Sequence, residues 1–382
     1  MLDMIEKLIV FFSGDFIWGL NVLRFTLLCL AAALVVVVIV IMVIGGRTNS
    51  RRFTRLANFM LEYLVLMAIL MLVIVTAIIE PRFISANNFR NIMGQFGPLS
   101  FTALGMTFII IGGFIDLSLP GMISMVAMVT LSLFDVVGEV PAMIFGIVLG
   151  TFMGALNGTI LVRVGATTQA KALFITFGMS QIYGAASQLY TGGFPINRTF
   201  FENPTPITQN LSSGTIGDFF SFSSFFDSIP VTFIVFLFFL IILFIFQKKS
   251  VLGRSINYTG GNFLAAELGG IPTKRIMIII YSICGFMVAI GAIAAFARTP
   301  VATPEIIGAN FERDSIMAVV VGGTSLVGGR GSVLRTVLGV TLIILLSNCM
   351  NLMQINSHLQ ETFRGAVLVT AIWLDHRRHA KG

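Results

Sequence analysis

The sequence predicts an all-α polytopic membrane protein. Of its 382 residues, 56% are hydrophobic and only 11% are charged, and the mean hydropathy is +0.96. Soluble domains carry about 25% charged residues, so a solvated globular enzyme and a disordered chain are both excluded. One helix needs ~20 predominantly apolar residues to cross the ~30 Å hydrocarbon core. The apolar content therefore sets a ceiling of about ten or eleven spans.

Uncharged apolar runs of spanning length define eight segments: residues 25–44, 63–79, 98–115, 119–134, 140–162, 172–190, 229–246 and 276–296. Three further segments, 315–327, 333–353 and 362–374, are short or carry an arginine. Short or glycine-interrupted segments at membrane depth usually pack inside the protein. We therefore interpret residues 315–327 as a short or re-entrant helix.

The positive charges favour one side of the membrane. With eleven crossings and a cytoplasmic C-terminus, the N-terminus is outside. Eight of the 24 Lys and Arg residues then lie in outside loops: Lys7, Arg24, Arg82, Arg90, Arg198, Arg298, Arg313 and Arg364. The other 16 fall in cytoplasmic loops, where Lys and Arg are usually in excess. Membrane topology thus explains the net charge of +7, and nucleic-acid binding is not expected.

Two connecting segments are long enough for a function of their own. Residues 191–228 form an extracytoplasmic loop that is too short for a catalytic domain. Residues 247–275 form a cytoplasmic loop in which Ala265, Ala266, Glu267 and Leu268 precede a Gly-Gly-Ile-Pro sequence. Ala, Leu and Glu favour helix, and Gly followed by Pro ends it. This loop is therefore predicted to hold a short surface helix.

A glycine stripe marks the fifth predicted span. Gly146, Gly150, Gly154 and Gly158 recur every four residues and share one helix face, where another backbone can approach closely. A hinge or a substrate-lining stripe is the alternative interpretation. Asn157 lies beside the stripe, where it either makes an interhelical hydrogen bond or faces the interior.

Asp116 is predicted to lie at a helix break. Gly112 and Gly113 precede it, and Pro120 and Gly121 follow it. A charged residue at a helix centre costs ~2.5–3.5 kcal/mol on insertion scales, and broken helices are tolerated at membrane depth where they are buried or line a cavity. Asp116 therefore caps the next helix, joins a structural ion pair or stabilises the pathway.

Motifs for catalysis or metal binding are not recognisable. The glycine-rich segment 321–332 resembles a phosphate-binding loop only superficially, because the G-x-x-x-x-G-K-[ST] order is missing and no Gly-Lys pair occurs in the chain. Its glycines are expected to permit a tight cytoplasmic turn. Hydrolase motifs, paired carboxylates and Cys-x-x-Cys spacing are also missing in any suitable context. We therefore predict no catalytic residue and no metal ligand.

Several stretches together resemble the ribose, galactose and xylose type of bacterial ABC importer permease. The matching stretches are Asn88 to Ile92, Leu104 to Phe108, Ile115 to Ser118, Thr176 to Gly178, Thr191 to Gly193, Gly253-Arg254, Gly260 to Asn262, Ala265-Ala266, Gly322 to Gly331, Asn348 to Leu352 and Arg364-Gly365. The block from Gly322 to Gly331 is the most specific. Leu119-Pro120 departs from the more frequent Val-Gly, and residues 25–44 form an extra span.

The resemblance implies a ten-helix permease core in residues 61–382, preceded in residues 1–60 by an extra N-terminal helix and a basic cytoplasmic loop. It implies a bacterial inner-membrane location. The implied partners are ATP-binding subunits, a second permease copy and a soluble extracytoplasmic solute-binding protein. ATP and Mg would belong to the ATPase, with no cofactor on this chain. Residues 191–228 would help to meet the binding protein. The ATPase-coupling helix would comprise Ala265, Ala266, Glu267, Leu268 and Gly269, with an inert surface turn as the alternative.

The expected function is a non-catalytic permease subunit for a monosaccharide or a related neutral polyhydroxylated solute. The alternative is an ion-coupled secondary transporter, a class that usually needs intramembrane Asp, Glu or His. Of such residues, only Asp116 approaches this requirement. Polar groups in apolar helices either line the pathway or join helices, and these candidates are Thr107, Asp116, Asn157, Gln181, Asn348 and Asn351.

Overall fold

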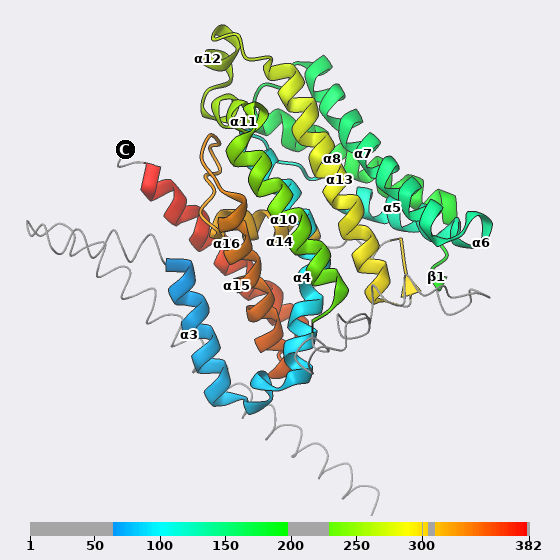
Figure 1. The fold of residues 1–382 in the computed structure, drawn as a ribbon, viewed down its shortest axis with the longest axis vertical. Coiled ribbons are helices and arrows are strands. Elements are labelled where there is room, and N and C mark those ends of the chain that lie inside the picture. Colours follow the sequence, from blue (N-terminus) through cyan, green and yellow to red (C-terminus); the bar gives the residue numbers. More distant parts are fainter. Residues whose placement is uncertain (1–63, 198–228, 300, 305–309, 380–382) are drawn as a thin grey trace, which may run out of the picture. The chain divides into compact units, whose positions relative to one another are not determined.

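The computed structural model describes residues 64–197, 229–299, 301–304 and 310–379 (Figure 1). The predicted span at 25–44, the predicted N-terminal region 1–60 and most of the loop 191–228 lie outside these residues. The described chain is almost entirely helical, which confirms the all-α polytopic class. The chain divides into two compact units. Of the described residues, 64–89 and 342–365 belong to unit 1, and all others belong to unit 2.

Unit 1 is built around the packing of two apolar helices. Its elements are α3 (Leu64–Ile79), η1 (Pro81–Ile84), the start of α4 (Ala86–Ile111), the end of α15 (Val333–Leu352) and the start of α16 (Ser357–His379). Helix α3 ends where Pro81 follows, since a residue before proline disfavours the helical conformation. Cys349, Met350 and Met353 form the buried core, and the Thr76 hydroxyl donates to Cys349 Sγ at 3.1 Å.

Unit 2 contains most of the helices. Beside the rest of α4, α15 and α16, it holds α5 (Leu119–Ser132), α6 (Phe134–Val137), α7 (Glu139–Val164), α8 (Gln169–Thr191), α10 (Val231–Lys249), α11 (Val251–Gly261), α12 (Phe263–Leu268), α13 (Thr273–Arg298) and α14 (Phe311–Val321). Strands β1 (Ile196–Asn197) and β2 (Val301–Ala302) pair antiparallel. Figure 1 shows α11 and α12 at one end of this unit and β1 at the other.

Five described helices are long and apolar enough to cross a membrane: α4, α7, α10, α13 and α15. Helices α3 and α5 are apolar but shorter. The predicted segments 172–190 and 362–374 form α8 and α16, which do not meet the same criterion. The most apolar window of α4 is 89% buried, against 28% for α10. Helix α4 is therefore an inner helix, whereas α10 exposes most of its apolar surface.

Two predicted boundaries differ most from the structure. Helix α4 begins at Ala86 and not at residue 98, because the helix continues through the polar residues that precede the apolar run and includes Pro98. Helix α14 ends at Val321 and not at residue 327, because Gly322 and Gly323 follow, the latter at φ +92°. Both predicted limits followed hydrophobicity, which does not mark helix ends.

The glycine stripe of α7 lies against α13 and α5. A Cβ added at Gly150 would lie 2.7 Å from Ala289 Cβ, and one at Gly158 would lie 2.8 Å from Ile278 Cα. A Cβ at Gly154 would overlap the Tyr281 carbonyl oxygen, while Gly146 faces Thr130 of α5. Helices α7 and α13 are therefore in backbone contact along their length, an arrangement that we name the α7–α13 seam.

Candidate translocation and coupling sites

The helix break predicted near Asp116 is present. Helix α4 ends at Ile111 and α5 begins at Leu119, which leaves residues 112–118, named here the break segment, outside both helices. The Asp116 side chain is 1% exposed, and its Oδ1 accepts hydrogen bonds from Ser118 N at 2.8 Å and Ser118 Oγ at 2.6 Å. Asp116 thus stabilises the turn that enters α5. Its Oδ2 has no hydrogen-bond partner among the described residues.

A buried polar network extends from Asp116 to two neighbouring helices. Ser118 Oγ accepts from Asn157 Nδ2 of α7 at 2.8 Å, and Asn157 Oδ1 accepts from the Tyr183 hydroxyl of α8 at 2.8 Å. Asn157 is fully buried. The structure therefore brings two sequence candidates, Asp116 and Asn157, together through Ser118. Asn157 makes the interhelical hydrogen bond that was one of its two expected roles.

The segment expected to couple to an ATPase is the short helix α12. The Asn262 side chain caps it by accepting from Ala265 N at 2.9 Å, and Gly269 follows its last residue. Ala266 is buried, whereas Leu264 and Leu268 are 65% and 83% exposed. A surface helix that buries one small residue and exposes two leucines is suited to protein contact.

A charged pair flanks this surface. Glu267 Oε1 lies 4.0 Å from Lys274 Nζ, and both side chains are solvent-accessible. Exposed pairs of this kind contribute little to stability. Glu267 and Lys274 are therefore available to a docking partner at little energetic cost.

The other candidate pathway residues lie in different surroundings. Thr107 is fully buried and its Oγ1 lies 2.7 Å from Thr336 Oγ1, so this pair joins α4 to α15 within unit 2. Gln181 is exposed on α8. Asn351 is exposed in unit 1 and its Oδ1 accepts from Gln360 Nε2 at 2.9 Å. Thr107 and Asn351 thus connect helices, and Gln181 points away from the packed interior.

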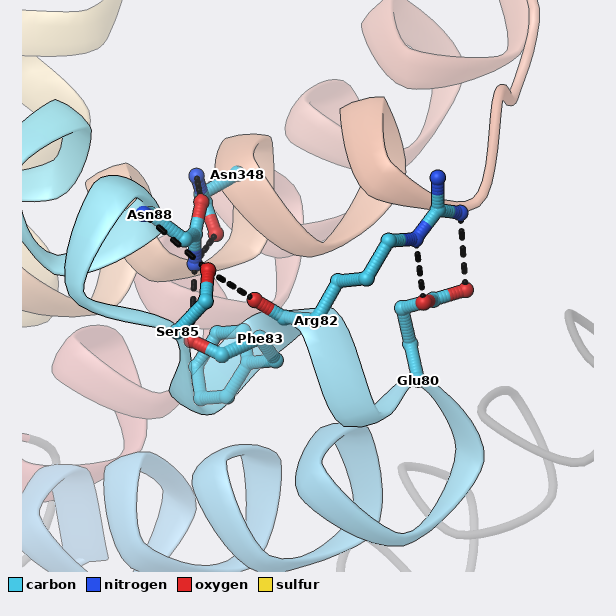
Figure 2. Close-up of polar contacts among 6 residues, drawn as sticks. All are labelled: Glu80, Arg82, Phe83, Ser85, Asn88 and Asn348. Carbon is cyan, nitrogen blue, oxygen red and sulfur yellow. Dashed lines mark hydrogen bonds and ion pairs between the residues drawn. The ribbon is translucent and has the colours of Figure 1, made fainter.

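Asn348 belongs to a reciprocal amide pair in unit 1. Asn348 Nδ2 donates to Asn88 Oδ1 at 2.8 Å, and Asn88 Nδ2 donates to Asn348 Oδ1 at 3.0 Å and to the Phe83 carbonyl at 2.9 Å (Figure 2). Both side chains are buried. Since each amide satisfies the other, this pair is a helix-to-helix contact.

An ion pair lies in the same region of unit 1. Arg82 Nε donates to Glu80 Oε1 at 2.7 Å, and Arg82 Nη2 donates to Glu80 Oε2 at 3.2 Å (Figure 2). The hydrogen bonds that it donates to Glu80 raise the pKa of the Arg82 guanidinium above its ordinary value. Arg82 is exposed and Glu80 is buried, so the carboxylate holds the guanidinium in place at the turn between α3 and α4, and the pair has no net charge.

The glycine-rich segment 321–332 forms a turn between α14 and α15. Gly329 N donates to the Ile111 carbonyl at 2.8 Å, Ser325 N to the Arg330 carbonyl at 2.9 Å and Gly328 N to the Ser325 carbonyl at 3.1 Å. A phosphate cradle needs free backbone N–H groups, and these three have protein acceptors. The interpretation as a tight turn therefore agrees with the geometry.

Sequence reasoning missed several residues that hold this region together. Gln247, 4% exposed at the end of α10, donates to the Gly331 carbonyl at 3.1 Å and accepts from Val333 N at 3.0 Å. Tyr183, Tyr281 and Thr336 were also missed. Gln247 follows an apolar run and was assigned to the cytoplasmic loop. A polar residue in the last turn of an apolar helix is the signal that could have identified it.

Five described helices long and apolar enough to cross a membrane, with a buried break segment between α4 and α5, define the class as a polytopic integral membrane protein. A family model described as "Branched-chain amino acid transport system / permease component" matches residues 88–372. The chain belongs to this permease family.

Curated relatives align with most of the chain. The chain is similar to the ribose import permease protein RbsC of Escherichia coli K12, with 30% identity over 331 residues, 86% of this chain and 97% of that protein. RbsC of Bacillus subtilis 168 is 32% identical over 316 residues, 82% and 92% of the two chains. The D-allose transport system permease protein AlsC of Escherichia coli K12 is 29% identical over 299 residues, 77% and 84% of the two chains. No solved structure matches the chain.

Proposed function

We propose that this chain is the permease subunit of an ATP-binding cassette importer and forms the pathway for a monosaccharide or a related neutral polyhydroxylated solute. The observation that carries the proposal is the alignment with two ribose import permeases over more than nine tenths of their length. An allose permease aligns over most of the same region. The sugar class therefore has support from two different named solutes.

The chemistry of the buried groups supports a neutral solute. Thr107, Asn157 and Asn348 are all buried and all have uncharged partners. These side chains are satisfied within the protein by uncharged groups, and a neutral solute needs no buried counter-ion. The inner helix α4 and its break segment are the elements around which we place the pathway.

The proposed assembly has a cytoplasmic and an extracytoplasmic end. Helix α12, with Ala265, Ala266, Glu267, Leu268 and the following Gly269, meets an ATP-binding subunit that carries ATP and Mg. The loop that follows β1 meets a soluble solute-binding protein. The placement of α12 and β1 at opposite ends of unit 2 supports this division (Figure 1). The C-terminus is then cytoplasmic and the N-terminus outside.

A second permease copy completes the proposed pathway, and residues 61–382 form the permease core of each copy, with residues 1–60 as the additional N-terminal region. The exposed apolar residues of α7 and α10 provide surfaces for that copy or for lipid. These include Phe145, Val148 and Phe152 on α7, and Phe238 and Ile241 on α10, all at least 49% exposed. Apolar side chains of this size require a lipid or protein neighbour.

One observation favours the alternative of an ion-coupled transporter. Asp116 Oδ2 is buried without a hydrogen-bond partner among the described residues, and intramembrane carboxylates are typical of coupling-ion sites. In this alternative, the chain alone transports its solute down an imposed proton or sodium gradient.

Uptake by proteoliposomes distinguishes the two functions. Vesicles are prepared with this chain, its ATP-binding subunits and enclosed ATP, and the solute-binding protein is added outside with labelled ribose or allose. We expect uptake that requires both ATP and the ATP-binding subunits and that a protonophore does not abolish. Gradient-driven uptake by the chain alone would contradict the proposal. Uptake of neither sugar by an ATP-hydrolysing complex would contradict transport of ribose and allose, the two solutes that the relatives' names give.

A further inference from the structure

We infer that the break segment transmits the movement of α12 to the transmembrane helices, and that Phe114 and Phe263 are the positioning residues at this contact. The inference deepens the proposed function and rests on it, because α12 acts here only if an ATP-binding subunit docks on it. The juxtaposition of α12 with the break segment carries the inference.

The first contact is a ring pair between the two elements. Phe263 is the first residue of α12, and Phe114 lies in the break segment two positions before Asp116. Their ring centroids are 6.2 Å apart and their planes meet at 86°. Phe114 is 2% exposed. Edge-to-face packing is a favoured and directional arrangement, so a displacement of α12 acts directly on a buried residue beside Asp116.

The second contact joins three backbone segments. A Cβ added at Gly328 would lie 2.7 Å from Gly113 Cα and 2.7 Å from the Gly260 carbonyl oxygen. Gly113 belongs to the break segment, Gly260 to the end of α11 just before α12, and Gly328 to the turn between α14 and α15. We name this contact the glycine junction. Close-packed interiors transmit strain, so these segments cannot move independently without losing contact.

A hydrogen bond reinforces the glycine junction. Gly329 N donates to the carbonyl of Ile111, the last residue of α4, at 2.8 Å. Gln169 Nε2, at the start of α8, donates to the Leu326 carbonyl of the same turn at 3.1 Å. The turn between α14 and α15 is thus fixed to α4 and to α8.

On its other side, the break segment is hydrogen-bonded to three further helices. The Tyr281 hydroxyl of α13 donates to the Ile115 carbonyl at 3.2 Å, and Leu117 N donates to Thr176 Oγ1 of α8 at 3.0 Å. Ser118 Oγ accepts from Asn157 of α7. Residues 112–118 therefore contact α12 at one point and α7, α8 and α13 at three others. This arrangement suits a segment that couples a surface helix to a helix bundle.

The ring contact must be distinguished from ordinary aromatic packing. Phe108 of α4 and Phe246 of α10 form a similar pair, with centroids 5.7 Å apart and planes at 67°. Neither residue belongs to the break segment or to α12. Phe246→Ala is therefore the matched control, since it removes one ring of an α4 pair without affecting the proposed contact.

The test measures solute transported per ATP hydrolysed in the complete transporter. Phe263→Ala is expected to lower this ratio by at least about fivefold, the lower range of coupling between sites, while the complex still assembles and hydrolyses ATP. Phe263→Tyr should restore most of the ratio. Phe114→Leu should lower it as well, and the double variant should be no worse than the more affected single variant, because both remove one interaction.

The possible outcomes distinguish a failure of this inference from a failure of the proposed function. A normal ratio in Phe263→Ala overturns the inference alone, and so does an equal loss in Phe246→Ala. Absence of ATP-driven uptake in the wild-type complex overturns the proposed function and the inference with it. A selective loss in Phe263→Ala that Phe263→Tyr reverses supports the inference.

Discussion

The α7–α13 seam and the glycine junction both depend on glycine, but they use it differently. In the seam, glycines lie within a regular helix and allow two helices to touch along one face. In the junction, Gly113 and Gly328 have φ values of +86° and +95° and lie between helices. Residues other than glycine rarely adopt such φ values. The comparison indicates that the seam fixes a rigid helix pair, whereas the junction joins two turns to the end of α11.

The largest expected effect concerns the seam. In Gly154→Ala, the new Cβ overlaps the Tyr281 carbonyl oxygen, so α7 and α13 must separate. We expect a loss of about 3 kcal/mol in stability, the upper range for overpacking, and little folded protein in size-exclusion chromatography. Gly178→Ala is the control, because no atom lies within 4 Å of its added Cβ. Equal yields of both variants would show that the seam is not tightly packed.

A substitution in the glycine junction should affect ATP-driven uptake more than folding. Gly328→Ala combines an unfavourable φ with overlap onto Gly113, and we expect a cost of about 2 kcal/mol and a clear loss of ATP-driven uptake. Gly165 has a φ of +68° and open space around it, so Gly165→Ala carries only the conformational cost, about 1 kcal/mol. Similar uptake by the two purified variants would contradict a role of the glycine junction in transport.

Substitutions of Asp116 test which hydrogen bonds hold the break segment in place. In Asp116→Ala, the Ser118 N–H and hydroxyl lose their shared acceptor, at a cost of about 1–2 kcal/mol. Asp116→Asn keeps a carbonyl oxygen at this position, so we expect near-normal ATP-driven uptake for Asn and a reduced rate for Ala. If Asn abolishes uptake while the folded complex still hydrolyses ATP, a charged or protonating carboxylate is required, as in the ion-coupled alternative.

The smallest expected effect is at Tyr183, the residue of the Asp116–Ser118–Asn157–Tyr183 network that lies farthest from Asp116 along its hydrogen bonds. Tyr183→Phe removes the hydroxyl that donates to Asn157 Oδ1 and keeps the ring. We expect a loss of about 1 kcal/mol, as for one intramolecular hydrogen bond, visible as a small decrease in Tm with uptake preserved. A large loss of uptake without a change in Tm would give Tyr183 a direct role in the pathway.

Local features of this fold could be predicted, whereas long-range contacts could not. The break near Asp116 and the helix around Ala266 follow from Gly, Pro and Ala within a few residues of each position. The hydrogen bond between Asn157 and Ser118 spans 39 residues, and the contact between Phe114 and Phe263 joins elements with several helices between them. Neither leaves a local pattern in one sequence.

The candidate pathway residues show the same limit. Polarity within an apolar helix singled out Thr107, Asn157 and Asn348, but their hydrogen bonds depend on partners such as Thr336 and Asn88. A buried amide must find a hydrogen-bond partner, and the sequence does not reveal which one. Pathway lining by these three residues, and by Asp116, Gln181 and Asn351, stays a prediction.

Photo-cross-linking at α12 tests the central claim most directly. A benzophenone amino acid replaces Leu268, which is 83% exposed, and in a parallel variant it replaces Phe194, which is 74% exposed next to β1. In the complete transporter, we predict an adduct with the ATP-binding subunit from position 268 and none from position 194. An actively transporting complex that gives no adduct at 268, or the same adduct at 194, would contradict the account.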